Sequence, residues 1–446
     1  NKTLKNIVIK KGHDIRMSGL PTNNSISDFH SSSVSLLPNQ FRGVKPKLMV
    51  SEGDKVKVGQ ALFFDKTKPD VKWPSPANGF VKEIKFGPRR VIEKIEIAIE
   101  GKETLKHGTL SKEQIKSSNK DTILGHILNA NLFPLIRQRP FNKVADPNCD
   151  PRDIFISGYN SAPLAVDIHP ILERNKEAFQ LGLTALSKLT AGEVFLTLKE
   201  AIDFEDVQVQ TIAGPHPAGN VGIQIHHIKP LKPNEVIWTM NAQHVITLGR
   251  LFESGIYDPK IIVSIGGSGA DKPEFAKALM GTKIESFLDN QSSNKPVRII
   301  SGDVLTGHTV ERHDFIGFYD SSITIIDDKV DRPFLGMLSP GSSKTKYSLT
   351  NTFLTLTNPL FNFTTSQNGE KRAMVPINAW ENVLPMDILP NPLYRAILSQ
   401  DIEEMEQLGI WECDDEDFAL CSFACPSKID VGKVIREGLD LLELEG

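Results

Sequence analysis

The pattern of apolar and polar residues changes character several times along the chain. Between residues 50 and 99, short apolar runs are separated by Gly-Asp, Gly-Gln and Asn-Gly pairs. These pairs permit the positive φ angles that sharp reversals between strands need. The last run, at 95–99, alternates apolar with other residues, as a half-buried strand does. The stretch therefore predicts a small unit built from short strands.

Residues 121–258 carry a different pattern, in which strand-like and helix-like segments alternate. Apolar runs at 153–158 and 193–198 predict strands. The segments 175–189 and 241–253 have apolar residues at helical spacing, so we predict helices there. Strands that alternate with helices favour a parallel sheet, and we predict an α/β domain here.

The remainder of the chain changes from β-rich to helical. A strand predicted at 260–265 opens a β-rich region that extends to about residue 328. The C-terminal helix predicted over 431–445 has one apolar stripe, formed by Val431, Ile435, Leu439 and Leu442. Weaker patterns predict a strand at 7–12, a loop at 22–35, a linker helix or loop at 101–120, partly irregular structure at 341–370 and a helix at 401–409.

Length, composition and charge exclude several classes of protein. The chain has 446 residues, enough for two to four domains with well-filled cores. A net charge of −4 and a pI of about 6.3 lack the basic excess of a general nucleic-acid or anionic-membrane binder. We find no apolar run long enough for a membrane-spanning helix and expect no signal peptide. Four cysteines in this length argue against a disulfide framework and fit a reducing cytoplasm.

The glycine-rich turns do not have the spacing of a nucleotide site. A dinucleotide site needs Gly-x-Gly-x-x-Gly between a strand and a helix, so that the backbone can approach the pyrophosphate. The turn at 158–163 has large residues where glycines belong. The turn at 266–269, with 271–273 as a potential helix cap, is a weak match that we interpret as a tight structural turn. The Pro- and Gly-rich segment 214–220 predicts a rigid loop, either structural, which we favour, or presenting amides to a ligand.

Histidines and acidic residues also lack a convincing ligand pattern. His226 and His227 are adjacent, so on a strand they would face opposite sides and would not share one metal ion. No His-Glu-x-x-His spacing occurs, and we predict no metal site. The acidic run at 412–417 is interpreted as a solvated face or a helix N-terminal cap.

Three of the four cysteines lie close together near the C-terminus. A [4Fe–4S] centre needs four thiolates, commonly with Cys-x-x-Cys spacing and a Cys-Pro step. Cys413, Cys421 and Cys425 do not have that spacing, and Cys149 is far away in the sequence. The Cys425-Pro426 step and the helices around it therefore suggest a ferredoxin-like domain without its cluster.

A cluster of cations interleaved with an aromatic residue lies at 137–143, beside a proline. The residues that we single out are Arg137, Arg139, Phe141 and Lys143. This mixture suits an anionic partner, a lipid headgroup region or the rim of a quinone site, whereas the structural alternative is a solvated loop. Quinone reduction also needs an apolar slot and a proton donor, and no residue identifies itself as that donor.

The stretch 50–99 resembles the biotinyl/lipoyl carrier domain, a barrel-sandwich hybrid. Both halves of that pattern are present, as Glu-Gly-Asp-x-Val-x-x-Gly-Gln-x-Leu and Ser-Pro-x-x-Gly-x-Val-x-x-Ile. A true carrier presents a modifiable lysine on the hairpin between the halves, where this chain has Lys66 and Lys68. The flanking residues of either carrier motif are missing, so we interpret both lysines as ordinary surface charge.

Over nearly its whole length the chain resembles one family, the A subunit of the sodium-translocating NADH:quinone reductase (Na+-NQR). The most specific segment is the tail at 415–428, with its Cys-x-x-x-Cys-Pro step. The other matching segments are 9–15, 50–99, 139–144, 214–219, 370–377 and 385–390. The order of domains is also similar to that in the Rnf complex C subunit and in the flavoprotein subunit of complex I.

The resemblance implies a multidomain α/β protein with four parts. They are a barrel-sandwich hybrid at 1–110, a Rossmann-like α/β domain with a parallel sheet at 121–258, a ubiquitin-like β-grasp (SLBB) domain at 259–330 and a helical ferredoxin-like domain without a cluster at 371–446. The flavin and iron–sulfur sites of the relatives are missing where this chain departs from them, in its glycine turn and its cysteines.

The resemblance also implies a function. The chain is expected to be a peripheral subunit on the cytoplasmic face of the bacterial inner membrane, within a complex that transfers electrons from NADH to ubiquinone and exports Na+. It would brace the membrane-embedded quinone-site subunit, with the residues at 137–143 nearest to ubiquinone and no tightly bound cofactor of its own. The alternative is a carrier protein that bears biotin or lipoate on Lys66 or Lys68.

Overall fold

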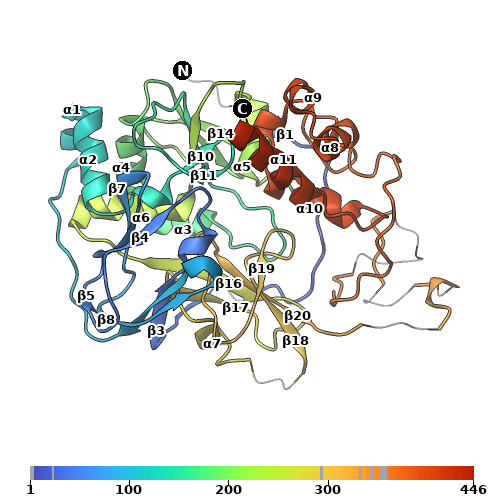
Figure 1. Ribbon diagram of the computed structural model, residues 1–446, viewed down its shortest axis with the longest axis horizontal. Helices are drawn as coiled ribbons and strands as arrows, with labels where there is room; N and C mark the ends of the chain where they lie inside the picture. The colour runs from blue at the N-terminus through green and yellow to red at the C-terminus, as the bar shows by residue number, and fades with distance from the viewer. Residues whose placement is uncertain are drawn as a thin grey trace.

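The computed structural model describes residues 5–445 except 23–24, 292–294, 331–333, 339, 342–345, 351–352 and 354–358. The described residues form four β-sheets and a group of C-terminal helices. Figure 1 shows these helices at the upper right of the molecule, and the strands of the N-terminal part at its lower left. Much of the segment predicted to be irregular, 341–370, lies outside the described residues.

The largest sheet has seven strands in the order β1-β14-β13-β12-β15-β10-β11. The first five strands run parallel, as the alternation of strands and helices predicted, whereas β10 and β11 are antiparallel additions at one edge. The sheet is therefore mixed rather than purely parallel. Its strands are β1 (Lys5–Val8), β14 (Gln208–Ala213), β13 (Val194–Leu198), β12 (Ile154–Ser157), β15 (Ile237–Asn241), β10 (Arg137–Arg139) and β11 (Lys143–Val144).

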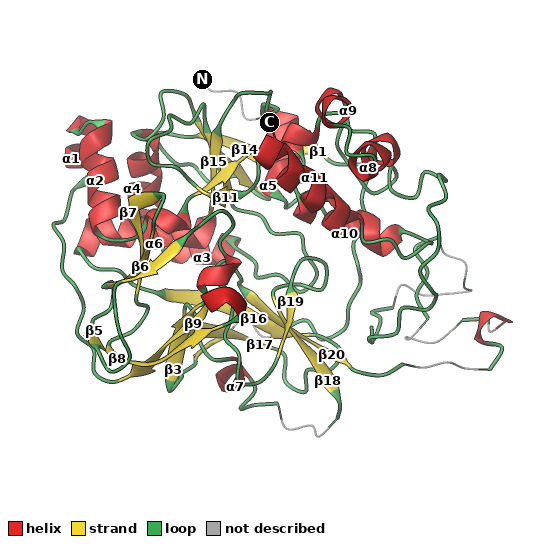
Figure 2. Ribbon diagram, viewed as in Figure 1, coloured by secondary structure: helices red, strands yellow, loops and turns green. Residues whose placement is uncertain are grey.

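Helices pack against this sheet and against each other (Figure 2). The helices α4 and α6, both predicted from their apolar spacing, cross at two glycines. A Cβ atom on Gly182 would lie 2.3 Å from the Val245 carbonyl oxygen, and one on Gly249 would lie 1.6 Å from that of Ala178. Only glycine permits so close a crossing. The helices of this region are α1 (Lys112–Ser117), α2 (Lys120–Asn129), α3 (His169–Arg174), α4 (Lys176–Ser187), α5 (Val221–Ile228) and α6 (Ala242–Ser254).

The N-terminal strands form the predicted barrel-sandwich hybrid. A four-stranded sheet, β3-β9-β8-β5, faces a three-stranded sheet, β4-β6-β7. Phe63 and Trp73 are fully buried and stack with their ring centroids 4.6 Å apart, in a core that the apolar runs supply. The strands are β3 (Ser33–Leu36), β4 (Pro46–Leu48), β5 (Lys55–Val56), β6 (Ala61–Asp65), β7 (Lys68–Pro74), β8 (Gly79–Phe86) and β9 (Ile92–Ile99).

The β-rich region predicted after residue 260 forms a six-stranded sheet in the order β19-β18-β20-β16-β17-β2. The turn at 266–269 leads into strand β17 rather than a helix, so 271–273 do not cap one. Gly267 has φ +119° and its amide donates to the Gly19 carbonyl at 3.1 Å, which makes it a tight backbone crossing. The strands are β2 (Ile26–Asp28), β16 (Lys260–Gly266), β17 (Glu274–Leu279), β18 (Val297–Ser301), β19 (His308–Val310) and β20 (Ser322–Asp327), and a short helix, α7 (Ile284–Phe287), lies between them.

The C-terminal part is helical, as predicted. The stripe of apolar residues on α11 is buried, since Val431, Ile435, Leu439 and Leu442 are each at most 1% exposed. The helices are α8 (Pro390–Leu398), α9 (Ile402–Gln407), α10 (Asp415–Ala424) and α11 (Val431–Glu445). No helix among the described residues is long and apolar enough to cross a membrane.

The start of the chain joins domains that are distant in sequence. The range predicted as the first domain, 1–110, contains β1, which pairs with β14 of the seven-stranded sheet, and β2, which pairs with β17 of the six-stranded sheet. The loop predicted at 22–35 was therefore wrong, because it contains β2 and most of β3. Ile7 and Ile9 pack in the same apolar core as the C-terminal helices.

Candidate functional site

The four residues singled out at 137–143 lie on a β-hairpin at the edge of the seven-stranded sheet. β10 and β11 pair with each other, and the turn between them begins with a cis peptide bond between Arg139 and Pro140. Phe141 and Asn142 have positive φ angles of 80° and 49°. This turn brings the hairpin against the first turn of α10 and the side of α11.

Arg139 is the centre of a buried ionic cluster. It is only 2% exposed, and its Nη1 atom lies 3.2 Å from an Asp417 carboxylate oxygen. Its Nη2 atom donates to Glu416 and lies 3.8 Å from Asp414. Burial alone would lower the pKa of Arg139, but the three carboxylates outweigh it and raise that pKa. The structural alternative of a solvated loop is therefore wrong for this residue.

The carboxylates of this cluster are themselves buried. Burial raises the pKa of Asp417 to about 8 and that of Asp414 to about 6, because the charged form loses its hydration. The pKa of Asp415 falls to about 2, since burial is outweighed by Arg436 and Arg42. The acidic run at 412–417 thus lies at the N-terminus of helix α10, in agreement with one of the two predicted alternatives. The other alternative, a solvated face, is wrong for Asp414 and Asp417, because both are buried against arginines.

A second arginine, from α11, completes the junction. Arg436 pairs with Asp414 and Asp415 and donates from Nη1 to the Phe141 carbonyl oxygen at 2.9 Å. Asn142 donates to Asp414 at 2.9 Å. Sequence reasoning missed Arg436, although a cation inside a strongly acidic C-terminal region was a usable signal for an internal ion pair.

The N-terminus of α5 closes the junction from the other side. A Cβ atom on Gly222 would lie 2.1 Å from the Asp417 carboxylate and 2.8 Å from Arg139, so a side chain there would displace the ion pair. Asn220, the last residue of the predicted rigid loop, donates to the Glu416 carbonyl at 3.2 Å. The loop at 214–220 thus has a structural role at this site.

The same loop is packed tightly against its neighbours. His216 is 2% exposed, its Nδ1 atom lies 2.9 Å from the Ser161 hydroxyl, and its amide donates to Asp14 at 2.8 Å. Burial lowers the pKa of His216, so the ring is neutral near pH 7. The Ser161 hydroxyl in turn accepts from the Gly219 amide at 2.7 Å. Because the His216 and Gly219 amides already donate these hydrogen bonds, they are not available to bind a ligand.

The other three residues of the hairpin also have partners within the chain. Phe141 is half-buried against Trp411, with ring centroids 5.8 Å apart. Lys143 pairs with Glu443 of α11, and its ammonium lies 5.4 Å from the centre of the Phe141 ring. The guanidinium of Arg137 lies 4.3 Å from the centre of the Tyr319 ring. The hairpin therefore connects the seven-stranded sheet to the helical part and to the six-stranded sheet.

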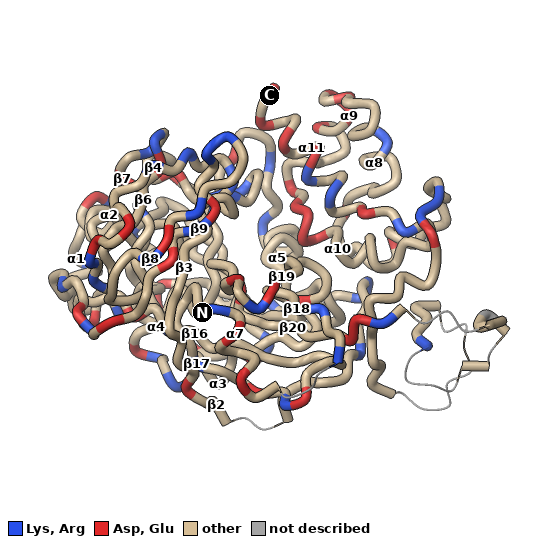
Figure 3. Tube along the Cα trace, turned by 60° about the horizontal axis from the view of Figure 1, so that its bottom comes forward, with Lys and Arg blue, Asp and Glu red and all other residues tan. Residues whose placement is uncertain are grey.

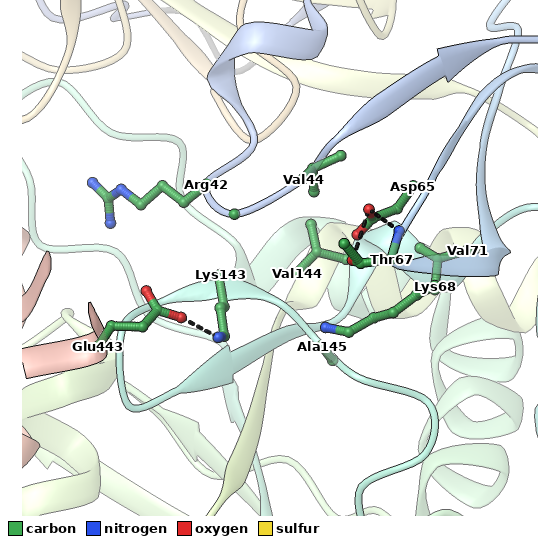
Figure 4. A pocket seen from close by; sticks show the side chains of 11 residues that line it. Arg42, Val44, Asp65, Thr67, Lys68, Val71, Lys143, Val144, Ala145 and Glu443 are labelled. Atoms are coloured by element: carbon green, nitrogen blue, oxygen red, sulfur yellow. Dashed lines mark hydrogen bonds and ion pairs between the residues drawn. The ribbon is translucent and has the colours of Figure 1, made fainter. Parts of the chain in front are cut away.

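A hollow of about 180 Å³ lies beside Lys143, between the barrel-sandwich, β11 and α11 (Figure 4). Lys68, one of the two candidate carrier lysines, lines the same hollow and lies 3.7 Å from Asp146. Asp65 is buried there and accepts from the Thr67 amide at 3.0 Å. Lys66 is exposed at the hairpin tip. The structure thus brings Lys68 and Lys143 together, which the sequence did not predict.

A second hollow, of about 190 Å³, lies at the carboxyl ends of β12 and β13. Its lining includes Gly158, Tyr159 and Asn160 from the first glycine turn, together with Lys199 and His169. A Cβ atom on Gly158 would lie 3.1 Å from the Thr197 carbonyl oxygen, so this glycine serves close packing between neighbouring strands.

The paired histidines lie on helix α5, not on a strand. His226 Nδ1 lies 2.7 Å from Glu412, and its Nε2 atom accepts from the Asp387 amide at 3.0 Å. His227 Nε2 lies 2.8 Å from the Pro385 carbonyl oxygen. The strand geometry considered for them was wrong, and both side chains attach the helical part to the α/β domain.

The three C-terminal cysteines are buried free thiols. Burial raises the pKa of Cys413 and of Cys421, which holds these thiols protonated rather than as the thiolates that ligate metals. Within the described part of the chain, no group of three or more His, Cys, Asp or Glu side chains is arranged to hold a metal ion.

Three family models match the chain in the order of its domains. They are the NqrA N-terminal barrel-sandwich hybrid domain at residues 7–100, the NqrA second alpha/beta domain at 118–257 and the NQRA C-terminal domain, an SLBB model, at 262–312. Among curated proteins, the NqrA protein of Hahella chejuensis, named as the A subunit of Na(+)-translocating NADH-quinone reductase, is 36% identical over 99% of this chain and 100% of its own length.

The chain belongs to the NqrA family of Na(+)-translocating NADH-quinone reductase. The corresponding proteins of Neisseria meningitidis serogroup B and Pasteurella multocida are 35% and 36% identical, again over 99% of this chain and the whole of theirs. The predicted family and fold class are thereby confirmed, and the chain is one component of a translocase complex, with the other components as partners. An NAD+-reducing [NiFe]-hydrogenase covers 51% of the chain at 12% identity, with a TM-score of 0.32, too low to inform function.

Proposed function

We propose that this NqrA protein braces the membrane-embedded, quinone-binding subunit of Na+-NQR at the cytoplasmic face of the bacterial inner membrane. The complex reduces ubiquinone to ubiquinol with electrons from NADH and exports Na+. In this proposal the chain binds no cofactor tightly and no nucleic acid, and it contributes through the surfaces that it presents to its partners. The family name of the relatives supports the reaction, and the internal packing of the candidate sites supports the bracing role.

The observation that carries the proposal is the buried junction around Arg139. The guanidinium, the carboxylates of α10 and Gly222 of α5 form one closely packed contact between the α/β domain and the helical part. Arg42 of the barrel-sandwich adds an ion pair to Asp415 at 2.9 Å. Residues from three domains thus meet at one junction, which suits a bracing subunit.

Within this junction, the aromatic pair Phe141 and Trp411 is the part that we place nearest to ubiquinone. Both rings are half-buried, so part of their apolar surface faces outward beside the cation of Lys143. An apolar ring with a neighbouring cation suits the rim of a site for a quinone headgroup. Arg139 is too deeply buried to touch a ligand and acts on the site by positioning Phe141.

Replacement of Phe141 with Ala tests this placement in the assembled complex. We expect KM for ubiquinone to rise by about tenfold, because a buried aromatic contact contributes roughly 1–2 kcal/mol to binding. The matched control is Phe204→Ala, since Phe204 is also half-buried and packs on Phe179 with ring centroids 5.0 Å apart, away from the junction. If the two variants have the same ubiquinone kinetics and inhibitor sensitivity, Phe141 does not border the quinone site.

The carrier alternative has less support from the geometry. Lys68 lines a hollow and has a carboxylate neighbour, so Lys66 is the more exposed of the two lysines on the hairpin. A carrier lysine must reach the active site of another enzyme, whereas the domain that bears Lys66 is tied to the helical part through Arg42. The family relationship favours the bracing role.

A further inference from the structure

The hairpin between β8 and β9 combines exposed apolar and cationic side chains at one tip. Phe86 is 44% exposed and Val91 is 49% exposed, one on each side of the turn. The turn itself is closed by the Gly87 amide, which donates to the Val91 carbonyl at 2.8 Å. Two large apolar side chains are thus held in solvent at the end of a well-formed hairpin.

Arg89 and Arg90 form the tip of this hairpin. Both are exposed, and neither has a carboxylate within ion-pair distance among the residues that the structure describes. The Arg90 guanidinium lies 5.7 Å from the centre of the Phe86 ring. Both arginines have positive φ angles, 56° and 58°, which are unfavourable for residues with a Cβ atom. Lys85, in contrast, lies 3.5 Å from Glu93.

The part of the barrel-sandwich around the hairpin tip is also positively charged. Residues 41–99 contain 13 Lys and Arg against 7 Asp and Glu, a net charge of +6 in a chain whose total is −4. Residues 401–446 contain 3 Lys and Arg against 14 Asp and Glu. Figure 3 shows the acidic residues along α9, α10 and α11, and basic segments around β4 and β9. The molecule is therefore strongly polarised, although its net charge is small.

We propose that the β8–β9 hairpin tip is a contact site for anionic phospholipid, with Arg89 and Arg90 among the headgroups and Phe86 and Val91 at the acyl boundary. Cations attract the negative surface of the cytoplasmic leaflet, and flanking apolar side chains bury a few ångströms deeper. An acidic protein partner would need a far larger interface than two exposed apolar residues supply. The inference rests on the peripheral membrane location in the proposed function. It adds the part of the chain that contacts the membrane and the class of lipid that it contacts.

The test is cosedimentation of the purified full chain with phosphatidylcholine vesicles that contain or lack phosphatidylglycerol. We expect binding only to the anionic vesicles, reduced by about tenfold or more in the double variant Arg89→Ala/Arg90→Ala. Phe86→Ala/Val91→Ala should weaken the same binding. Raising the salt from about 0.1 M to about 1 M should also weaken it, because the screening length falls from roughly 10 Å to 3 Å.

The matched control is Lys10→Ala/Lys11→Ala, which removes the same charge from two exposed lysines that lie outside the two sheets of the barrel-sandwich, after strand β1. It should bind as the parent chain does, and thermal unfolding should be the same for all variants. Vesicle binding that does not depend on phosphatidylglycerol would overturn the inference. An equal loss of binding in the control and in the arginine variant would overturn it as well. Absence of vesicle binding would also overturn the inference. Weaker assembly of the arginine variant into the complex would then identify a protein partner at this hairpin instead. Because the assay uses the chain alone, its failure is separate from failure of the proposed function.

Discussion

At the residue scale, one arginine decides how the candidate site is built. Arg139 follows Gln138 in a segment whose charge and proline suggest an open loop, yet its side chain is almost fully buried among three carboxylates. Those carboxylates follow it by more than 270 residues in the sequence. Burying a guanidinium is costly unless ion pairs and hydrogen bonds compensate, so the cluster depends on all its members.

Replacement of Arg139 with Ala should therefore be strongly destabilising. It leaves Asp417 buried without its cation and Asp414 with Arg436 alone, and we expect a loss of about 3–5 kcal/mol in the free energy of unfolding, measured in urea at a pH above 8, where Asp417 is ionised in the folded parent. Arg42→Ala is the control, since Arg42 has 38% of its side chain exposed and its pair with Asp415 should contribute less than about 1 kcal/mol. Equal losses in the two variants would show that the buried cluster does not hold the domains together.

At the element scale, the first turn of α10 couples the junction to pH. Its acidic residues lie at the positive end of the helix dipole, which favours Asp415 as an anion. Asp417, on the buried side, has a folded-state pKa of about 8, far above its unfolded value. The folded state thus retains a proton that the unfolded state has lost, and stability from this group falls as pH rises toward 8.

The variant Asp417→Asn should remove this dependence. Between pH 6 and pH 8 the parent should lose up to about 1.4 kcal/mol per pH unit through this group, whereas the variant should not. Urea unfolding at pH 6, 7 and 8 measures the difference. Asp415→Asn is the control, because a pKa of about 2 leaves Asp415 charged throughout that range. Parallel pH profiles for the parent and Asp417→Asn would contradict the assignment.

The sequence predicted elements whose signals are local. The helices α4, α6 and α11 have apolar residues at helical spacing, and the barrel-sandwich has glycines such as Gly53 and Gly59 at positive φ. In contrast, β2 lies in a segment rich in Ser and Asn, which has no apolar run that would predict a strand. Its pairing with β17 joins residues about 250 positions apart, which periodicity does not reveal.

The candidate site was predicted only in part for the same reason. Charge and an aromatic residue identified the segment at 137–143, and the acidic run at 412–417 was recognised separately. Only the fold shows that they meet, since Arg139 and Asp417 are far apart in the sequence. Gly222 carried no signal at all, because its importance comes from the space that the ion pair occupies.

At the scale of the whole molecule, buried ion pairs of Arg139 join the acidic helical part to the α/β domain, and the partly exposed Arg42 links the basic barrel-sandwich to the same acidic residues. The features that resembled ligand sites in the sequence are used for internal packing, as in the loop at 214–220 and the crossing of Gly267 with Gly19. Among the residues that the structure describes, these features thus serve contacts within the chain. We therefore propose that the chain acts in Na+-NQR by bracing a partner subunit.

The most direct test of that role is reconstitution of Na+-NQR in liposomes with and without this chain. We predict that the complex without it still oxidises NADH with an artificial electron acceptor but loses ubiquinone reduction and Na+ uptake, and that adding the chain back restores both. Na+ uptake driven by ubiquinone reduction in the complex that lacks the chain would contradict the account.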